Sequence, residues 1–195
     1  MRYFLMVLVL FVMVVGCTKE TTPQVESEPT AQVEEKSPVE RVMEMPNMTA
    51  ALAMTMSEMG NRYQNVSPGT ALFASWAMKH MSPQDVITTN NEVTFGLAMK
   101  DIVEARGKRM CVTGYIIELE IMNLPLGKMG TGKLMDEDRN IYNLLAVRST
   151  GTLVEQDEAT FCGIITEKYD YLSSDDMTRH ALTLVGMFAL PENIY

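Results

Sequence analysis

The run of β-branched and aromatic residues over 108–122 restricts the fold more than any other part of this sequence. Residues of these kinds favour strands. Apolar and polar residues alternate along the run, but the apolar phase that includes Val112 gives way to the opposite phase from Ile117 onward. Gly114 lies between the two phases, and a change of phase at a glycine is typical of a β-bulge. The run therefore predicts one long strand that bends near Gly114.

Four further segments after this run have the composition of strands, and clusters of turn residues separate them. They are 133–135, 140–147, 159–169 and 180–188. Five strands, of which the first is long and bent, resemble an OB-type barrel. A small β-sandwich is the alternative arrangement.

The start of this β-rich half also resembles the opening of bacterial OB-like domains. In those domains a helix precedes a Gly-Lys pair and a strand with spaced glycine and aliphatic residues. The matching residues here are Gly107, Lys108, Val112, Gly114, Ile116 and Leu119. The resemblance spans 92–190 and implies an α+β fold, in which N-terminal helices precede a five-stranded OB-like β-barrel. The segment 149–158 departs from the common form, because it is too short and polar for a helix between the third and fourth strands.

Helical patterns fill the region before the strands. Apolar residues recur at helical spacing in three segments, which are 49–59, 70–81 and 92–105. Thr49 is a suitable N-cap for the first, and Gly107 is a suitable residue just past the third. His80 lies on the apolar face of the second and is expected to be a hydrogen-bonded core residue. The helical segment 46–106 and the OB-like domain 107–195 have the size of one globular unit.

The first residues of the chain have the pattern of an export signal. Residues 4–15 are all apolar, and Gly16 and Cys17 follow them. This run is too short for a transmembrane helix, which needs about 20 residues, and it fits a signal peptide over 1–16. The residues Val14-Val15-Gly16-Cys17 resemble the lipobox of bacterial lipoproteins. The resemblance implies lipid on Cys17, which would tether the protein to a membrane of the cell envelope. Thr18, where an Asp favours the inner membrane, implies the outer membrane, facing the periplasm or the cell surface.

Residues 17–45 have the composition of a spacer. The stretch after Cys17 is rich in Thr, Glu, Pro and Ser, and it carries seven acidic and three basic residues. Such a segment buries too little apolar surface to offset its chain entropy. We therefore expect a disordered acidic tether between the lipid and the folded domain.

The charge of the chain constrains its partners. The sequence has 25 acidic and 16 basic residues, and its formal net charge is −9. Because nucleic-acid binding depends on neutralising phosphates, this balance predicts that nucleic acids are not partners. The expected partners are the membrane, through the lipid, and a protein, peptide or glycan of the envelope.

A glycine-rich segment supplies the candidate binding residues. Residues 127–133 match the G-x-x-x-x-G-K core of a P-loop, but Leu134 stands where a P-loop has Ser or Thr, and no helical pattern follows. No nucleotide is therefore expected. We predict instead a flexible loop between the first two strands, which borders the binding face in OB-like folds. The candidate binding residues in this loop are Lys128, Gly130, Gly132 and Lys133.

Methionine is abundant, with 18 residues in the chain. Several crowd the first helical segment, including Met48, Met56 and Met59. Thioethers bind Cu(I), so a periplasmic copper-handling protein is an alternative function. The same methionines also form an ordinary apolar helical stripe, and no metal or other cofactor is assigned.

Two cysteines remain besides Cys17. Cys111 lies in the first predicted strand and Cys162 in the fourth. An oxidising compartment favours a disulfide between two such thiols, and these two strands are neighbours in an OB-like barrel. A Cys111–Cys162 bridge is therefore predicted, with two buried reduced thiols as the alternative.

The sequence contains none of the common catalytic motifs, such as G-x-S-x-G, H-E-x-x-H or C-x-x-C. The leading hypothesis is a non-enzymatic envelope lipoprotein that presents a binding domain. The alternatives are the copper-handling protein and an enzyme of unrecognised type, which would require a pocket with convergent polar groups.

Overall fold

The computed structural model describes residues 35–60, 62–63, 65–173 and 176–190, and Glu35–Tyr195 form one compact unit. The predicted signal peptide and Cys17 lie outside the described residues. In the described part of the chain, no helix is both long and apolar enough to span a bilayer.

Short helices precede the strands. They are α1 (Pro38–Met43), α2 (Met48–Thr55), the 3₁₀ turn η1 (Met56–Glu58), α3 (Pro68–His80), α4 (Pro83–Val86), α5 (Phe95–Lys100) and α6 (Ile102–Ala105). Side chains at their N-caps explain where several begin: Ser67 accepts a hydrogen bond from the amide of Thr70, and Asp101 accepts one from Glu104. The predicted third helix is broken in two at Asp101. The first begins after Asn47, not at Thr49, because Asn47 accepts from the amide of Ala50.

Helix α1 corrects the predicted tether, which is too long at its C-terminal end. Ser37 and Glu40 form a capping box, and Pro38 occupies the first helical turn. Val42 is buried, and α1 contacts α3. The polar composition of 17–45 hides this, because α1 packs only Val42 and Met43 into a core that later helices supply.

Five long strands form one closed sheet. They are β2 (Arg109–Leu124), β3 (Gly127–Met135), β4 (Ile141–Ala146), β5 (Glu158–Leu172) and β6 (Thr178–Phe188), with a short β1 (Arg62–Tyr63) beside β5. The pairings run β2–β3–β4–β6–β5 and return to β2. Only β4–β6 is parallel within this ring. The α+β fold with an OB-like domain is thus confirmed, and a sandwich of two sheets is not formed.

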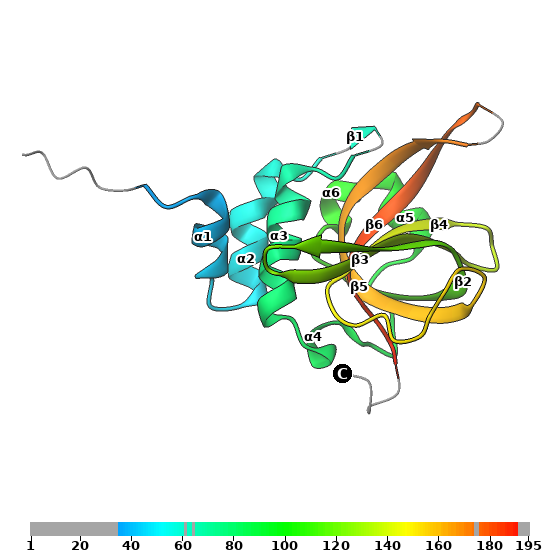
Figure 1. Cartoon of the computed structure of the whole chain (residues 1–195). Helices are drawn as coiled ribbons and strands as arrows, with labels where there is room; N and C mark the ends of the chain where they lie inside the picture. Colours follow the sequence, from blue (N-terminus) through cyan, green and yellow to red (C-terminus); the bar gives the residue numbers. More distant parts are fainter. Residues whose placement is uncertain (1–34, 61, 64, 174–175, 191–195) are drawn as a thin grey trace, which may run out of the picture. The chain divides into compact units, whose positions relative to one another are not determined.

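The sheet closes without a helix between β4 and β5. Residues 147–157, between these strands, form turns. Closure comes from direct pairing of β6 with both β4 and β5. Figure 1 shows α1, α2 and α3 gathered on one side of this sheet.

The bend in β2 lies three residues later than predicted. The register with β3 shifts between Ile116 and Glu118, so the extra residue is Ile117. Burial alternates regularly through Gly114. Gly114 is required for another reason: a Cβ there would lie 2.1 Å from the carbonyl oxygen of Met135. The glycine permits close approach of β3, and the bulge follows it.

The predicted flexible loop over 127–133 is wrong, because these residues form most of β3. Only Pro125 and Leu126 make the turn from β2. A Cβ on Gly132 would lie 2.1 Å from the carbonyl oxygen of Glu118, opposite the bulge. The glycines therefore allow β3 to cross β2 closely, and their spacing reflects strand packing.

Two apolar clusters hold the unit together. One lies between the helices and the sheet and includes Phe73, Trp76 and Val185. The other lies between the strands and α5 and α6, and includes Leu134 and Phe161.

Candidate functional site

The site is built on one edge of β2. Along Arg109–Tyr115 the first edge of β2 pairs with β5, whereas β3 joins the opposite edge only from Tyr115 onward. The loop between α4 and α5 covers the start of that second edge. The amide of Glu92 donates to the carbonyl of Arg109 (3.2 Å), and the Glu92 carboxylate accepts from the Arg109 amide (2.9 Å).

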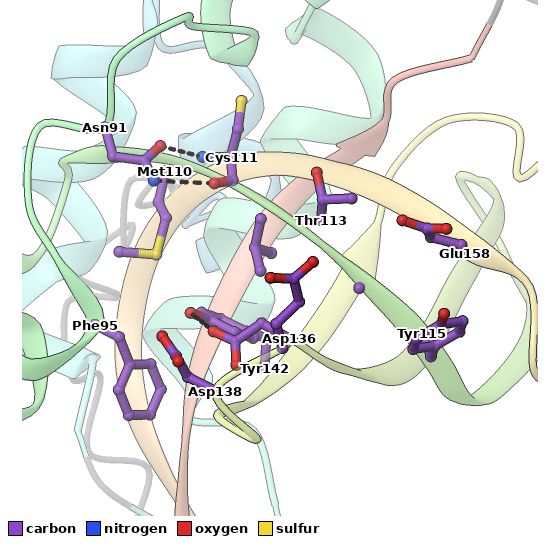
Figure 2. A pocket seen from close by; sticks show the side chains of 13 residues that line it. Asn91, Phe95, Met110, Cys111, Thr113, Tyr115, Asp136, Asp138, Tyr142 and Glu158 are labelled. Atoms are coloured by element: carbon purple, nitrogen blue, oxygen red, sulfur yellow. Dashed lines mark hydrogen bonds between the residues drawn. The ribbon is translucent and has the colours of Figure 1, made fainter.

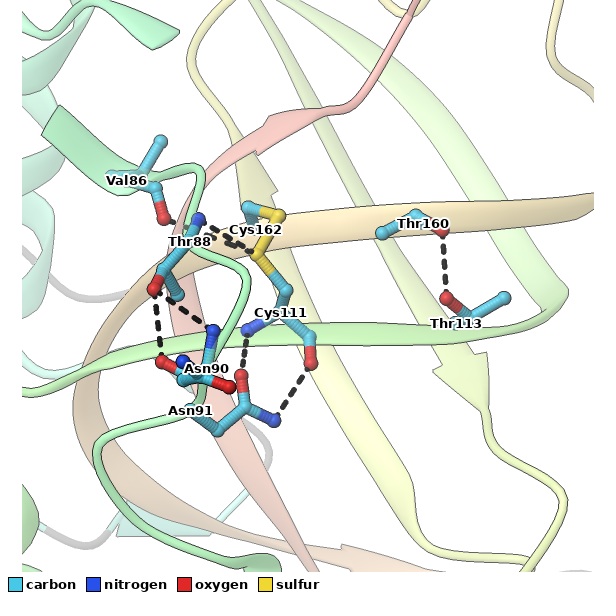
Figure 3. The surroundings of a disulfide bond; sticks show 8 residues. All are labelled: Val86, Thr88, Asn90, Asn91, Cys111, Thr113, Thr160 and Cys162. Atoms are coloured by element: carbon cyan, nitrogen blue, oxygen red, sulfur yellow. Dashed lines mark hydrogen bonds between the residues drawn. A yellow bond between two sulfur atoms is a disulfide. The ribbon is translucent and has the colours of Figure 1, made fainter. Parts of the chain in front are cut away.

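Asn91 covers the same edge of β2 at the next outward-facing residue, Cys111. Its side-chain oxygen accepts from the Cys111 amide at 2.7 Å, and its side-chain nitrogen donates to the Cys111 carbonyl at 3.0 Å. Figure 3 shows both bonds, with the Asn91 amide lying along β2 as a neighbouring strand would. Beyond Asn91 the edge opens into a cavity.

This cavity, which we call the β2-edge cavity, has a volume of about 430 Å³. Its walls come from the α4–α5 loop, α5, β2, the β3–β4 turn, β4 and the start of β5. The lining residues are Asn91, Phe95, Met110, Cys111, Val112, Thr113, Gly114, Tyr115, Asp136, Glu137, Asp138, Tyr142 and Glu158. Figure 2 shows their side chains.

The charge of this lining is uniformly negative. Four lining residues are acidic, namely Asp136, Glu137, Asp138 and Glu158, and none of the described lining residues is Lys, Arg or His. Glu137, Asp138 and Glu158 are exposed, so their carboxylates are available to a ligand. Three rings accompany them, those of Phe95, Tyr115 and Tyr142.

Asp136 organises the wall below these exposed acids. It accepts hydrogen bonds from the amide of Asn140 (2.8 Å), the Asn140 side chain (2.9 Å) and the Tyr142 hydroxyl (2.9 Å). These bonds hold the turn that ends β3. Burial raises the pKa of Tyr142 above its ordinary range, and the hydrogen bond to Asp136 adds a smaller increase. Tyr142 therefore remains a neutral donor, and its ring packs edge-on against Phe95, with centroids 5.3 Å apart.

The predicted disulfide is present beside the cavity. Cys111 and Cys162 are register partners on β2 and β5, and their sulfurs are bonded. The amide of Thr88 points at Cys111 Sγ from 3.5 Å. Two residues along β2, the hydroxyls of Thr113 and Thr160 lie 2.7 Å apart (Figure 3). The bridge thus fixes β2 to β5 at the point where the opposite edge of β2 opens.

The four binding residues predicted from the glycine-rich segment do not line one common site. Lys128 and Gly130 border a second hollow of about 450 Å³, together with Ile121, Leu126 and Arg148. Gly132 and Lys133 are not part of its described lining, and Lys133 Nζ pairs with Glu118 at 2.6 Å. Arg148 is held by the carbonyl of Met81, to which its Nη2 donates at 2.6 Å.

The expectation for His80 is wrong, because its side chain is exposed at the end of α3. It stacks on Trp76 and lies 3.1 Å from the carbonyl oxygen of Met43. His180 is also exposed and contacts Asp170. In the described part of the chain, His, Cys, Asp and Glu form no group that could hold a metal ion.

The methionines of the first helical segment pack into the core. Met59 is buried, and Met43, Met45, Met48, Met54 and Met56 are partly buried against the cluster between the helices and the sheet. Their thioethers therefore fill space in this cluster.

No protein-family model matches this chain, and no curated protein sequence matches it either. A solved structure that resembles part of it is the small single-stranded DNA-binding protein from Streptomyces coelicolor. The two are 14% identical with a TM-score of 0.30, over 43% of this chain and 91% of the other. This finding corrects the prediction that nucleic acids are not partners. A net charge summed over a whole chain does not describe each face of it, as Lys128 and Arg148 around the second hollow illustrate.

The acidic cavity was missed from the sequence. Its residues come from six segments that only the sheet register brings together. The available signal was the acidic turn 136–138 directly after a strand, although nothing local links this turn to Tyr115 or Glu158.

Proposed function

We propose that this protein is an envelope lipoprotein, anchored through Cys17, whose OB-like domain binds a positively charged segment of a protein or peptide without catalysis. The observation that carries the proposal is the β2-edge cavity, where four carboxylates and three aromatic rings meet with no basic residue among the described lining.

Carboxylates beside rings suit a cationic side chain. An ammonium or guanidinium group gains from a carboxylate and from the face of a ring. Glu137, Asp138, Glu158 and Tyr115 are the accessible members, and Tyr115 is 55% exposed. Electrostatic attraction would also speed the encounter with a cationic partner.

A binding role fits the chemistry of the cavity better than catalysis. General acid–base groups work best when their pKa lies near the working pH. The pKa of Tyr142 moves away from neutrality. Asp136, the most enclosed acid, is occupied by Asn140 and Tyr142. These groups shape the wall and leave the rim acids for a ligand.

The proposed anchor leaves room for such a role. Residues 18–34 stand between Cys17 and the described unit. At about 3.5 Å per residue, 17 residues span at most about 60 Å. The domain would therefore reach partners near the membrane surface. Intact mass of the full chain and of a Cys17→Ser variant tests the anchor, because only the former should carry diacylglyceryl and acyl groups.

Binding is tested by calorimetry on the full chain in detergent micelles. The probes are short lysine-rich and glutamate-rich peptides of equal length. We expect the lysine-rich peptide to bind and an Asp138→Asn, Glu158→Gln variant to lose at least about tenfold in affinity. The charge-matched control is Glu120→Gln, Glu155→Gln, two exposed acids outside the cavity lining. Equal losses in the two variants would reject the cavity as the site.

A further inference from the structure

The backbone of Thr113 forms an open position on the edge of β2. Along an antiparallel strand, alternate residues direct both their N–H and C=O groups to the same edge. Arg109 and Cys111 direct theirs away from β5, because they bond to Glu92 and Asn91. The even-numbered neighbours face β5: Ile116, for example, bonds to Asp157 and Gln156 on that side. Thr113 therefore directs its N–H and C=O away from β5.

The positions on either side of Thr113 are filled. Asn91 occupies the position at Cys111, and Met135 of β3 pairs with Tyr115. The chain leaves the sheet immediately after Met135, because Asp136 is held in the β3–β4 turn by Asn140. In the described part of the chain no residue pairs with Thr113 on this edge. Thr113 lines the β2-edge cavity, so its open backbone faces the acidic space.

We propose that the ligand is a peptide chain, of which one residue pairs through its own N–H and C=O with Thr113 while its basic side chains contact Asp138 and Glu158. This inference rests on the proposed function and names its ligand class. Unpaired strand edges bind extended chains through main-chain hydrogen bonds. Charge complementarity selects a basic chain.

Asn91 demonstrates the geometry at the adjacent position. A planar amide, offering one donor and one acceptor, fits along the edge of β2 with bonds of 2.7 and 3.0 Å. A peptide group has the same pair of groups. Because Asn91 and Met135 bound the opening, a single peptide residue completes the edge, and side chains on either side of it meet the acidic rim.

The first measurement is the hydrogen exchange rate of the Thr113 amide, which NMR monitors on the full chain in detergent micelles. The probes are a short capped peptide of alternating valine and lysine, the same peptide N-methylated at each valine, and spermine. The unmethylated peptide should slow exchange of the Thr113 amide at least about tenfold, since exchange requires opening of the bonded state. The methylated peptide should bind at least about tenfold more weakly, and spermine should give no protection at Thr113.

A variant pair provides the second test. Thr113→Pro removes an N–H that makes no hydrogen bond to β5, so the pairing of β2 with β5 is kept. Thr113→Val keeps this N–H. Only the proline variant should lose affinity for the unmethylated peptide. If both peptides bind equally and Thr113 stays unprotected, the main-chain pairing is overturned while cation binding stands. If no probe binds, the proposed function fails with it. If Thr113→Pro does not fold, the methylated peptide alone decides.

Discussion

Cys111 of β2 and Cys162 of β5 face each other across two neighbouring strands, with their Cα atoms 4.0 Å apart. The disulfide between them ties the strand that borders the β2-edge cavity to the strand that lines the helical layer.

Removing this bridge should destabilise the domain. A closed loop with a sequence separation of 51 residues corresponds to about 4 kcal/mol on the chain-entropy model. We expect the Cys111→Ala, Cys162→Ala variant to lose a free energy of unfolding of this size in urea titrations. A loss below about 1 kcal/mol would show that the bridge adds little to a sheet already closed by hydrogen bonds.

Glu167 should stabilise the fold as a hydrogen-bond acceptor. Its side chain is buried, its Oε1 accepts from the Ser67 amide at 3.1 Å, and its Oε2 has no partner in the described part of the chain. Glu167→Gln keeps an oxygen acceptor for the Ser67 amide, so its unfolding free energy should stay close to that of the wild type. Glu167→Ala leaves the amide unsatisfied and should lower it by roughly 2 kcal/mol. Equal losses in both variants would contradict this account.

Gly132 should not tolerate a side chain. A Cβ there meets the carbonyl oxygen of Glu118 at 2.1 Å, so Gly132→Ala should cost roughly 2 kcal/mol or more in unfolding free energy. Gly96 is the matched control, because it lies in α5 with nothing within 4 Å of its added Cβ. Gly96→Ala should stabilise by about 0.5–1 kcal/mol. Both are measurable by thermal and urea unfolding.

Tyr142 should make the fold sensitive to alkali. Burial and the bond to Asp136 raise its pKa in the folded state above the ordinary 10.0, so the unfolded chain loses this proton first. The stabilisation is therefore complete below about pH 10 and declines as the pH rises further, by at most about 1.4 kcal/mol per pH unit. Unfolding free energies between pH 9 and 11 should fall less steeply for Tyr142→Phe than for wild type. A Tyr115→Phe variant, altered at an exposed ring, should follow wild type.

Local sequence patterns predicted the helices and strands but not which residues of different elements contact one another. Apolar spacing located α3, and β-branched composition located β2, because both reflect burial of one face. The phase change indicated a bulge, but the prediction placed it at Gly114. Gly114 instead avoids a clash with Met135, and the extra residue of the bulge is Ile117. The glycines of β3 imitate a loop because glycine serves both turns and close strand crossings. Sequence reasoning reached Cys111 and Cys162 through strand order, whereas the acidic cavity depends on registers that no local pattern encodes.

The position of α1 determines how mechanical load enters the domain. A pull applied at Glu35 reaches α1 first, and α1 is held to the rest of the unit by buried Val42, partly buried Met43 and contacts with α2 and α3. The strands that border the cavity lie beyond α3 and are joined by ladders and a covalent bridge. With the proposed N-terminal anchor, traction would load α1 before the sheet, so this helix would act as a weak link in series between the anchor and the strands.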